Sequence, residues 1–346
     1  MLRGVDAAKR VSRGFSSGQA LIVAQMGVSL VLLVGAGLFV RSFRQALMAD
    51  LGFSQEPAAI MRIDARGSGY EHDAWPDLYE RLYRSIEQQP AVERLVQTDR
   101  LPLDFWNSGV RFAVPSLDLF GGDGFGFVQS AAIGAEFFEV LGIPIISGRG
   151  FTDADGRDRP RVAIVNEAAA EWWWPDRSAV GQAIRVASDP NSDIRVVGVS
   201  GNAKIRSIGE GPRPYVYLPL DQVSTSTIQF VAKGTVSATE LVSVLRRAAT
   251  VVDPDLFIVE ARTLEEQIGF ILLLPRLAAL VFTLFGVLAL LLAGIGPYVV
   301  VSFSVAGRTR EIGIRLALGA DGGEVAAYVP ASRASRVSPV EALKSE

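Results

Sequence analysis

Two long stretches without a single charged side chain constrain this chain more than any other feature of its sequence. The first covers residues 20–40 and the second covers residues 277–306. About 20 apolar residues, at about 1.5 Å of helical rise each, are enough to cross the hydrocarbon core of a bilayer. Core helices of soluble proteins seldom run this long without a charge, so we predict two membrane-spanning helices.

The first stretch also has the basic start of a secretory signal peptide, which is the main alternative to a membrane anchor. Its apolar run is longer than the hydrophobic region of a typical signal peptide. Arg41 and Arg44 follow it, where a signal peptide would have small residues at a cleavage site. We therefore interpret residues 20–40 as an uncleaved transmembrane helix.

Basic residues beside the two stretches indicate which side of the membrane each end occupies. Four Lys or Arg residues lie within the first 13 positions, whereas the segment just before the second stretch is mostly acidic. Six more follow the second stretch: Arg308, Arg310, Arg315, Arg333, Arg336 and Lys344. Since cytoplasmic flanks carry the excess of Lys and Arg, we expect a multi-pass protein of the cell inner membrane with both termini in the cytoplasm. The region between the helices is then a large periplasmic domain.

The overall composition excludes several classes of protein. The formal net charge is −3, which gives no reason to expect a nucleic-acid partner. The chain has no cysteine, so disulfides and thiolate metal sites are excluded. The mean hydropathy of +0.28 reflects the two apolar stretches, and the residues between them have the pattern of a separately folded domain.

The region between the helices contains two units with the order strand, helix, strand. The first unit covers residues 58–99 around a helix at 75–88, and the second covers residues 227–260 around a helix at 237–251. Ser237 is a suitable N-cap for the second helix, with a glutamate three residues on. We predict that the two units pair in one split βαβ, ferredoxin-like subdomain.

Residues 100–225 are rich in strand and turn patterns, which predicts a β-rich subdomain inserted into the first. The predicted fold class is therefore an α+β membrane protein, in which two transmembrane helices flank a periplasmic α+β domain. The expected segments are a cytoplasmic N-terminal segment (1–19), transmembrane helix 1 (20–40), the periplasmic core domain (41–270), a stalk with transmembrane helix 2 (271–306), and a cytoplasmic coupling segment with the C-terminal tail (307–346).

No group of residues in the sequence predicts catalysis, a cofactor or a metal site. The single histidine, His72, has only adjacent acids beside it, and we interpret it as a solvated loop residue. The glycine-rich stretch at 121–126 lacks the GK[ST] of a phosphate-binding loop, so we expect a flexible loop. We expect Trp172–Trp174 to pack in the core, with a protein or lipophile contact as the alternative. An extracytoplasmic enzyme is therefore disfavoured, and any ATP must be bound by a partner.

Polar residues inside the first apolar stretch predict a helix–helix contact. Gln25 and Ser29 are four residues apart and share one helical face. Polar side chains in lipid are unfavourable unless they are paired, so we expect this face to pack against another helix. Neither stretch contains the buried ionisable group typical of an ion-coupled carrier. The second stretch is longer than the bilayer requires, and its amphipathic start at 264–276 predicts a periplasmic stalk.

The segment that leaves the second stretch, VAGRTREIGIRLALGA at 305–320, is basic and amphipathic. One interpretation is a helix that lies on the membrane surface. The other is a docking element for a cytoplasmic protein.

This segment resembles the one that follows the second membrane helix in MacB/FtsX-type ABC transporter permeases, where a coupling helix meets the ATPase. Further stretches similar to that family occur in the family's order: FVRSF (39–43), GIPIISGRGFTD (142–153), VAIVNE (162–167), residues 194–199 and PASRASRVSPVEAL (330–343). The chain is most similar to the C-terminal half of duplicated permeases that lack a fused ATPase.

The resemblance implies a non-catalytic permease subunit of an export or mechanotransmission system. ATP hydrolysis in a partner would move the membrane helices, which would move the periplasmic domain. It assigns ATPase coupling to Arg308, Arg310, Glu311 and Arg315. The implied partners are a cytoplasmic ABC ATPase subunit and membrane lipid, together with a periplasmic adaptor or a second permease copy.

The chain departs from the family in one respect. A family permease unit has four membrane helices, whereas here Ala320 leads through only nine residues to Pro330, too few for two spans. The third and fourth helices are thus expected to be missing. This leaves an alternative function: a truncated, non-transporting, membrane-anchored periplasmic interaction module.

Overall fold

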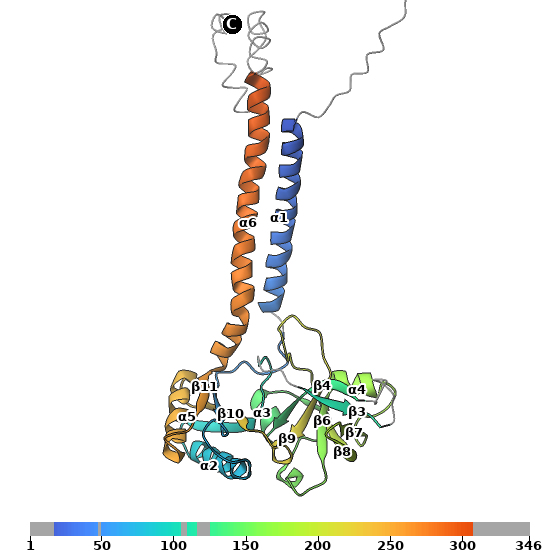
Figure 1. The fold of residues 1–346 in the computed structure, drawn as a ribbon, viewed down its shortest axis with the longest axis vertical. Helices are drawn as coiled ribbons and strands as arrows, with labels where there is room; N and C mark the ends of the chain where they lie inside the picture. Colours follow the sequence, from blue (N-terminus) through green and yellow to red (C-terminus); the bar gives the residue numbers. More distant parts are fainter. Residues whose placement is uncertain (1–16, 48–49, 105–108, 116–124, 307–346) are drawn as a thin grey trace, which may run out of the picture. The chain divides into compact units, whose positions relative to one another are not determined.

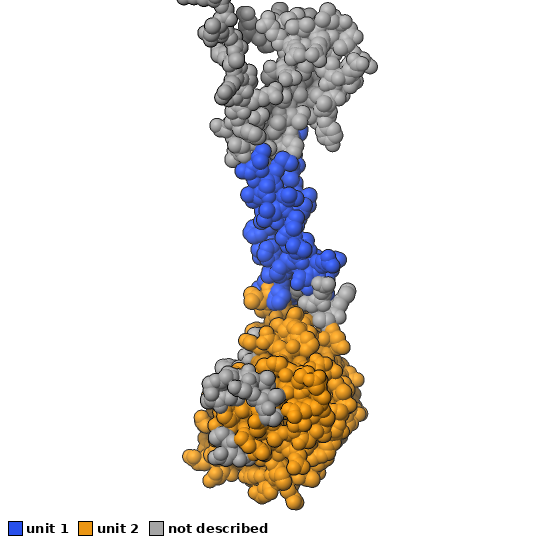
Figure 2. All heavy atoms as spheres, turned by 90° about the vertical axis from the view of Figure 1, so that its right-hand side faces the viewer, with its two compact units in different colours: residues 1–44, 275–346 blue, residues 45–274 orange. Residues whose placement is uncertain are grey.

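The structure, a computed structural model, describes residues 17–47, 50–104, 109–115 and 125–306 (Figure 1). The chain divides into two compact units (Figure 2). Residues 1–44 and 275–346 form one unit, and residues 45–274 form the other, called the core domain below.

Two long helices carry the uncharged stretches. Helix α1 extends over Ser17–Leu47 and helix α6 over Leu264–Ala306. Each contains a segment long and apolar enough to cross a membrane by length and composition, Val23–Ser42 in α1 and Leu273–Ile295 in α6. Helix α6 has 43 residues, so the amphipathic segment at 264–276 and the apolar stretch after it belong to a single helix.

Four strands of the core domain come from the two strand–helix–strand units. The strands are β1 (Ala59–Asp64), β2 (Val92–Thr98), β10 (Thr227–Gly234) and β11 (Ile258–Thr263), and they lie in the order β11-β1-β10-β2 with antiparallel neighbours. The connecting helices are α2 (Trp75–Glu87) and α5 (Ala238–Val252). The two units therefore interleave, because a strand of each lies between strands of the other.

Both faces of this four-stranded region are buried. Met61 and Ile63 of β1 belong to the hydrophobic cluster that contains the apolar faces of α2 and α5, whereas Ile60 belongs to a second cluster on the opposite face. Neighbouring residues of a strand point to opposite faces, so a sheet covered on both sides needs continuous apolar strands. Ser237 caps α5 as predicted, and its side chain accepts a hydrogen bond from the Glu240 N–H at 3.2 Å.

The inserted region contains seven further strands. They are β3 (Gly109–Ala113), β4 (Gly126–Ile133), β5 (Ile145–Gly148), β6 (Val162–Asn166), β7 (Ala183–Val186), β8 (Asp189–Ser200) and β9 (Tyr215–Pro219). Its helices are α3 (Phe137–Leu141) and α4 (Glu167–Trp173), and the core domain also has the 3-10 helices η1 (His72–Ala74), η2 (Asp153–Asp155) and η3 (Leu220–Gln222).

Six of these strands form a closed sheet. The order β4-β3-β7-β8-β6-β9 returns to its start because β9 also pairs with β4 in parallel. Closure of this kind removes the unpaired edges that an open sheet would expose. A third hydrophobic cluster, which includes Phe112, Val165 and Trp173, fills this part of the domain.

Three features of the sheets differ from the sequence prediction. The sequence pattern does not single out β3 or β5 as strands, and the glycines and proline around Ile145–Gly148 are more typical of a loop. Strand β11 ends at Thr263 rather than at residue 260. The inserted strands also join the four-stranded region, but only through one residue pair, Thr98 of β2 with Ile133 of β4.

A row of polar side chains crosses the buried sheet. Arg62 on β1 is paired in register with Gln229 on β10 and with Glu260 on β11, and Gln229 is paired with Thr98 on β2. Arg62 forms an ion pair with Asp104, which lies in the chain segment after β2, and its Nε is 3.2 Å from Glu260 Oε1. Gln229 Nε2 donates to Asp104 Oδ2 at 2.7 Å.

Both partners of the Arg62–Asp104 pair are almost fully buried, at 6% and 4% side-chain exposure. Charges placed in a protein interior require a partner, because desolvation of a lone charge costs several kcal/mol. The pair therefore ties the segment around Asp104 to the centre of the sheet.

Replacement of Arg62 by methionine should destabilise the core domain severely. The Arg62→Met variant removes the cation that is paired with the buried Asp104 carboxylate, at a cost of roughly 3–5 kcal/mol. The double variant Arg62→Met/Asp104→Asn should regain most of this loss. Chemical denaturation of the purified full-length chain measures the effect. Arg81→Met is the matched control, since Arg81 pairs with Asp77 at the surface and such pairs contribute little. Equal stability of Arg62→Met and Arg81→Met would contradict the assignment.

Candidate functional site

Helices α1 and α6 pack against each other in an antiparallel arrangement. Gln25 Nε2 donates a hydrogen bond to the Leu292 carbonyl oxygen at 3.0 Å. Phe39 and Phe282 stack with their ring centroids 4.7 Å apart. Residues early in α1 thus contact residues late in α6, and the reverse.

The contact face of each helix repeats with alternating steps of four and three residues. On α1 the buried or half-buried positions include Gln25, Ser29, Leu32, Ala36 and Phe39, and on the apolar part of α6 they include Pro275, Ala279, Phe282, Gly286, Ala289 and Ala293, while Gly35, Val40 and Ala278 beside this series are also half-buried. Such spacing produces the seam of a left-handed helix pair, and small residues let the two backbones approach closely. The structure places Ser29, at 3% exposure, and Gln25 on this seam.

The remaining faces of the two helices are apolar and exposed. Val31 on α1 is 71% exposed, and Leu280 on α6 is 61% exposed. Soluble monomers rarely expose apolar surface of this extent, which is typical of contact with lipid or with further apolar helices.

A disulfide should form across the seam when Ala36 and Gly286 are both replaced by cysteine. A Cβ atom at position 286 would lie 3.1 Å from the Ala36 Cβ, close to the roughly 3.5–4.5 Å that a disulfide requires. Because the chain has no cysteine of its own, maleimide–polyethylene glycol gel shifts after mild oxidation report this bond directly. The control pair is Val31→Cys/Gly286→Cys, which should stay reduced. Equal oxidation of both pairs would contradict the seam.

Helix α6 follows strand β11 without an intervening loop. The strand ends at Thr263 and the helix begins at Leu264. Thr263 Oγ1 accepts from the Glu266 N–H at 3.1 Å, and the Thr263 N–H donates to Glu266 Oε2 at 2.8 Å. This is a reciprocal capping box, and its signature TLEE at 263–266 is visible in the sequence. The Leu264 N–H also donates to the Ala58 carbonyl oxygen at 2.9 Å, so both ends of the joint are fixed to the sheet.

The four residues to which the resemblance assigns ATPase coupling, Arg308, Arg310, Glu311 and Arg315, lie outside the described residues. Most of the glycine-rich stretch at 121–126 also lies outside them, and its last residue, Gly126, begins β4.

A dense group of hydrogen bonds surrounds the single residue pair that joins β2 to β4. Thr98 Oγ1 donates to the Ala132 carbonyl oxygen, and the Asp99 N–H donates to the same oxygen. Asp99 Oδ1 in turn accepts from the Ala132 N–H at 2.7 Å. Burial raises the pKa of Asp99 to about 6, although the Arg100 guanidinium 3.5 Å away favours the charged form.

The raised pKa makes the stability of the core domain depend on pH. In the folded chain Asp99 keeps its proton up to about pH 6, whereas in the unfolded chain it loses the proton near pH 3.8. The unfolded state therefore binds fewer protons between these values, and the contribution of Asp99 to stability decreases as the pH rises from about 4 to about 6.

The Asp99→Asn variant should remove this contribution, because asparagine retains an acceptor for the Ala132 N–H and carries no charge. It should be more stable than the parent chain at pH 7.5, by roughly 1–3 kcal/mol, and nearly equal to it at pH 4. Thermal unfolding of both chains across this range measures the difference. A difference that does not change with pH would contradict the raised pKa.

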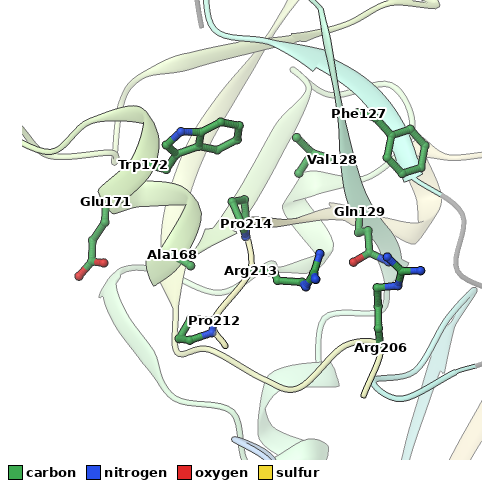
Figure 3. Close-up of a pocket in the computed structure, with 10 residues that line it drawn as sticks. All are labelled: Phe127, Val128, Gln129, Ala168, Glu171, Trp172, Arg206, Pro212, Arg213 and Pro214. Carbon is green, nitrogen blue, oxygen red and sulfur yellow. The ribbon is translucent and has the colours of Figure 1, made fainter. Parts of the chain in front are cut away.

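An open cavity of about 760 Å³ lies between β4, α4 and the segment before β9 (Figure 3). Its lining residues are Phe127, Val128, Gln129, Ala168, Glu171, Trp172, Arg206, Pro212, Arg213 and Pro214. In Figure 3 Trp172 and Phe127 lie on opposite sides of the cavity, with Arg213 and Pro214 between them. The volume is within the range of about 300–1,000 Å³ typical of small-molecule sites.

Helical spacing explains which residues of α4 line this cavity. Ala168, Glu171 and Trp172 lie three and four residues apart on one face, and Ala169 and Trp173 are buried on another. The prediction of core packing is therefore confirmed for Trp173 and for Trp174, which is 2% exposed. It is wrong for Trp172, which is 45% exposed because its position faces away from the core.

Asn166 holds the walls of the cavity together. It is 1% exposed and caps α4, accepting from the Ala169 N–H at 3.0 Å. Its Oδ1 also accepts from the Tyr215 N–H at 2.9 Å, and its Nδ2 donates to the Arg213 carbonyl oxygen at 2.7 Å and to Asn202 Oδ1 at 2.8 Å. One buried side chain thus fixes the helix and the segment that carries Arg213.

His72 lies beside a serine that is remote in the sequence. Its Nε2 is 2.7 Å from Ser224 Oγ, and its Nδ1 is 3.4 Å from Asp73 Oδ1. This pair could not be predicted from a local pattern because 152 positions separate the two residues. The His72 side chain is 64% exposed and the Asp73 carboxylate is fully exposed, so water competes for both hydrogen bonds. Among the described residues, no cluster of three or more His, Cys, Asp or Glu side chains could hold a metal ion.

Residues 20–248 match the family described as the MacB-like periplasmic core domain. The match covers more than half of the chain. This chain therefore belongs to the MacB/FtsX type of ABC transporter permeases, as the sequence resemblance indicated.

Curated relatives include a macrolide export ATP-binding/permease protein, MacB 1/2, of Paracoccus denitrificans, which is 28% identical over 58% of this chain and 30% of that protein. The uncharacterized ABC transporter permease YknZ of Bacillus subtilis is 27% identical over 55% of this chain and 48% of that protein. The chain thus matches less than half the length of each. Among solved structures, the periplasmic region of MacB from Actinobacillus actinomycetemcomitans is 15% identical and covers 60% of this chain and 89% of that one, with a TM-score of 0.41.

Proposed function

We propose that this chain is a permease subunit of an ABC-type export or mechanotransmission system. In this proposal α1 and α6 cross the inner membrane, both termini lie in the cytoplasm, and the core domain lies in the periplasm. A partner ATPase hydrolyses ATP and moves the helices, and the helices move the core domain. The chain itself has no catalytic role.

The observation that carries the proposal is the direct joint between β11 and α6. Because no loop separates Thr263 from Leu264, a displacement of the start of α6 must displace β11 as well. Strand β11 pairs along its length with β1, and β1 pairs with β10. Motion that enters through the helix therefore reaches the centre of the four-stranded region instead of being absorbed by a flexible linker.

We infer further that the core domain works as two parts, a split βαβ, ferredoxin-like subdomain and an inserted β-rich subdomain. The support is the contrast between dense pairing within each part and the single residue pair between β2 and β4. A displacement at this joint would change the inserted part's position while each part keeps its own strand pairing, and it would rearrange the hydrophobic cluster that the parts share, which contains Ile60 and Val231 as well as Ile133.

The membrane and ATPase roles are supported by different features. The apolar outer faces of α1 and α6 suit membrane lipid or further permease helices, including those of a second copy. The family membership supports a cytoplasmic ABC ATPase as partner, docked at Arg308, Arg310, Glu311 and Arg315. A periplasmic adaptor is the remaining partner that the proposal includes.

Site-specific photo-crosslinking tests this proposal. A benzoylphenylalanine at Glu311, introduced into the chain in its own host, should capture an ATPase with a Walker A motif, identified by mass spectrometry. The same group at Val251, which is 82% exposed in the core domain, is the control and should not capture it. The Glu311→Arg variant should lose co-purification with the captured ATPase. Capture of no ATPase at Glu311, or equal capture at both positions, would refute the proposed coupling.

A further inference from the structure

The cavity between β4, α4 and the segment before β9 has a combination of linings that the proposed coupling function does not use. One part is apolar, formed by the exposed rings of Trp172 and Phe127 together with Pro212 and Pro214. The other is cationic, formed by Arg206 and Arg213. Rings at 45% and 65% exposure leave apolar area that a ligand could cover, and guanidinium groups are the preferred protein partners of carboxylates.

The segment that carries the two arginines is fixed in place by Glu210. Its Oε1 accepts from the backbone N–H groups of Ile205 and Arg206, at 2.6 and 2.8 Å, and its Oε2 is 3.1 Å from Arg213 Nε. The Glu210 side chain is only 6% exposed. The arginines therefore stand on a preorganised segment, so less ordering entropy opposes ligand binding.

The charged side chains at the cavity are Arg206, Arg213 and Glu171, and they differ in whether they form an ion pair. Arg213 is neutralised by Glu210, whereas no carboxylate among the described residues lies within ion-pair distance of the Arg206 guanidinium. The ion pair with Glu210 occupies Nε of Arg213, and an arginine has further donors on its two Nη groups. A carboxylate placed on the arginine side of the cavity would pair with Arg206 and accept hydrogen bonds from both arginines, away from Glu171 on the α4 side.

We propose that this cavity binds a small organic anion that carries one carboxylate on an apolar body. The carboxylate pairs with Arg206 and Arg213, and the apolar body lies between the rings of Trp172 and Phe127. Glu171, on the α4 side of the cavity, disfavours a second negative charge. The proposal does not rest on coupling to an ATPase, because every residue that it uses belongs to the core domain.

Binding to the full-length chain in phosphatidylcholine nanodiscs tests the proposal, with isothermal titration calorimetry as the measurement and empty nanodiscs as the blank. The probes are 4-phenylbutanoate, 4-phenylbutylammonium, 4-phenylbutanol and phenyl phosphate. We expect 4-phenylbutanoate to bind in excess of the blank and more tightly than the other three. Equal or tighter binding of the ammonium, alcohol or phosphate probe would overturn the assignment of a monovalent carboxylate.

Variants locate the binding. Arg206→Gln should weaken 4-phenylbutanoate binding about tenfold, the size expected for loss of a charge-assisted hydrogen bond. Trp172→Ala should weaken it as well. Arg247→Gln, which removes an exposed arginine of α5 outside the cavity, is the matched control and should bind as the parent does. Glu171→Gln should bind equally well or better. Equal affinity of Arg206→Gln and Arg247→Gln would overturn the proposal, as would loss of binding in Glu171→Gln, which would indicate a ligand with a cationic group.

The folding of each variant is checked by its thermal unfolding midpoint. Arg213→Gln removes the ion pair with Glu210 and can disturb the segment, so Arg213→Lys is compared with it. Lysine keeps the positive charge but loses the forked donor geometry of arginine. We expect intermediate affinity for Arg213→Lys in a chain with a parental midpoint. Parental affinity in Arg213→Gln would exclude Arg213 from the site and overturn the two-arginine arrangement.

Discussion

The core domain is organised around a charge that the apolar sheet cannot hold alone. Arg62 stands in the middle of a strand buried on both faces, and it is acceptable there only because Asp104, Gln229 and Glu260 surround it. Asp104 brings the segment that leads into the inserted subdomain down onto the sheet. Such a network contributes little net stability relative to an apolar core of the same volume, whereas removal of one partner from it is strongly destabilising.

The same region limits how the two parts of the core domain can move. Next to the polar row, strands β2 and β4 are paired at one position, Thr98 with Ile133. The hydrogen bonds beside this position involve the Asp99 carboxylate, which is buried and poorly solvated. Because burial disfavours the charged form, the pKa of this carboxylate is raised. Strand pairing between the two parts is therefore limited to one residue pair, whereas the hydrophobic cluster that contains both Ile60 and Ile133 is shared by them.

The proposed coupling through α6 and the proposed binding at the cavity depend on different physical interactions. In the proposed function α6 transmits displacement through covalent continuity and the capping box at Thr263 and Glu266, so that step depends on stiffness rather than affinity. The cavity near Trp172 instead depends on fixed arginines and exposed rings, so its effect depends on complementarity.

The family resemblance and the main elements could be predicted from the sequence because they depend on local or periodic signals. The two uncharged stretches, the apolar faces of α2 and α5, and the Ser237 cap are all properties of neighbouring residues. The capping box TLEE at 263–266 is equally local, and it marks Leu264 as the first residue of α6 directly after β11. Gln25 and Ser29 could be placed on one face by helical spacing, although their neighbours on α6 could not be identified.

The remaining features depend on residues that are distant along the chain. The closure of six strands through β4 and β9, and the pairs Arg62–Asp104 and His72–Ser224, depend on contacts between remote segments that no local pattern specifies. Trp172 is exposed while its two neighbours are buried because the direction in which α4 packs determines which face meets the core. The sequence by itself determined the membrane-type helices, the α+β composition and the family. Only the tertiary structure decided which polar residues are buried together and where a cavity opens, because burial and side-chain pairing depend on how remote segments of the chain pack against one another.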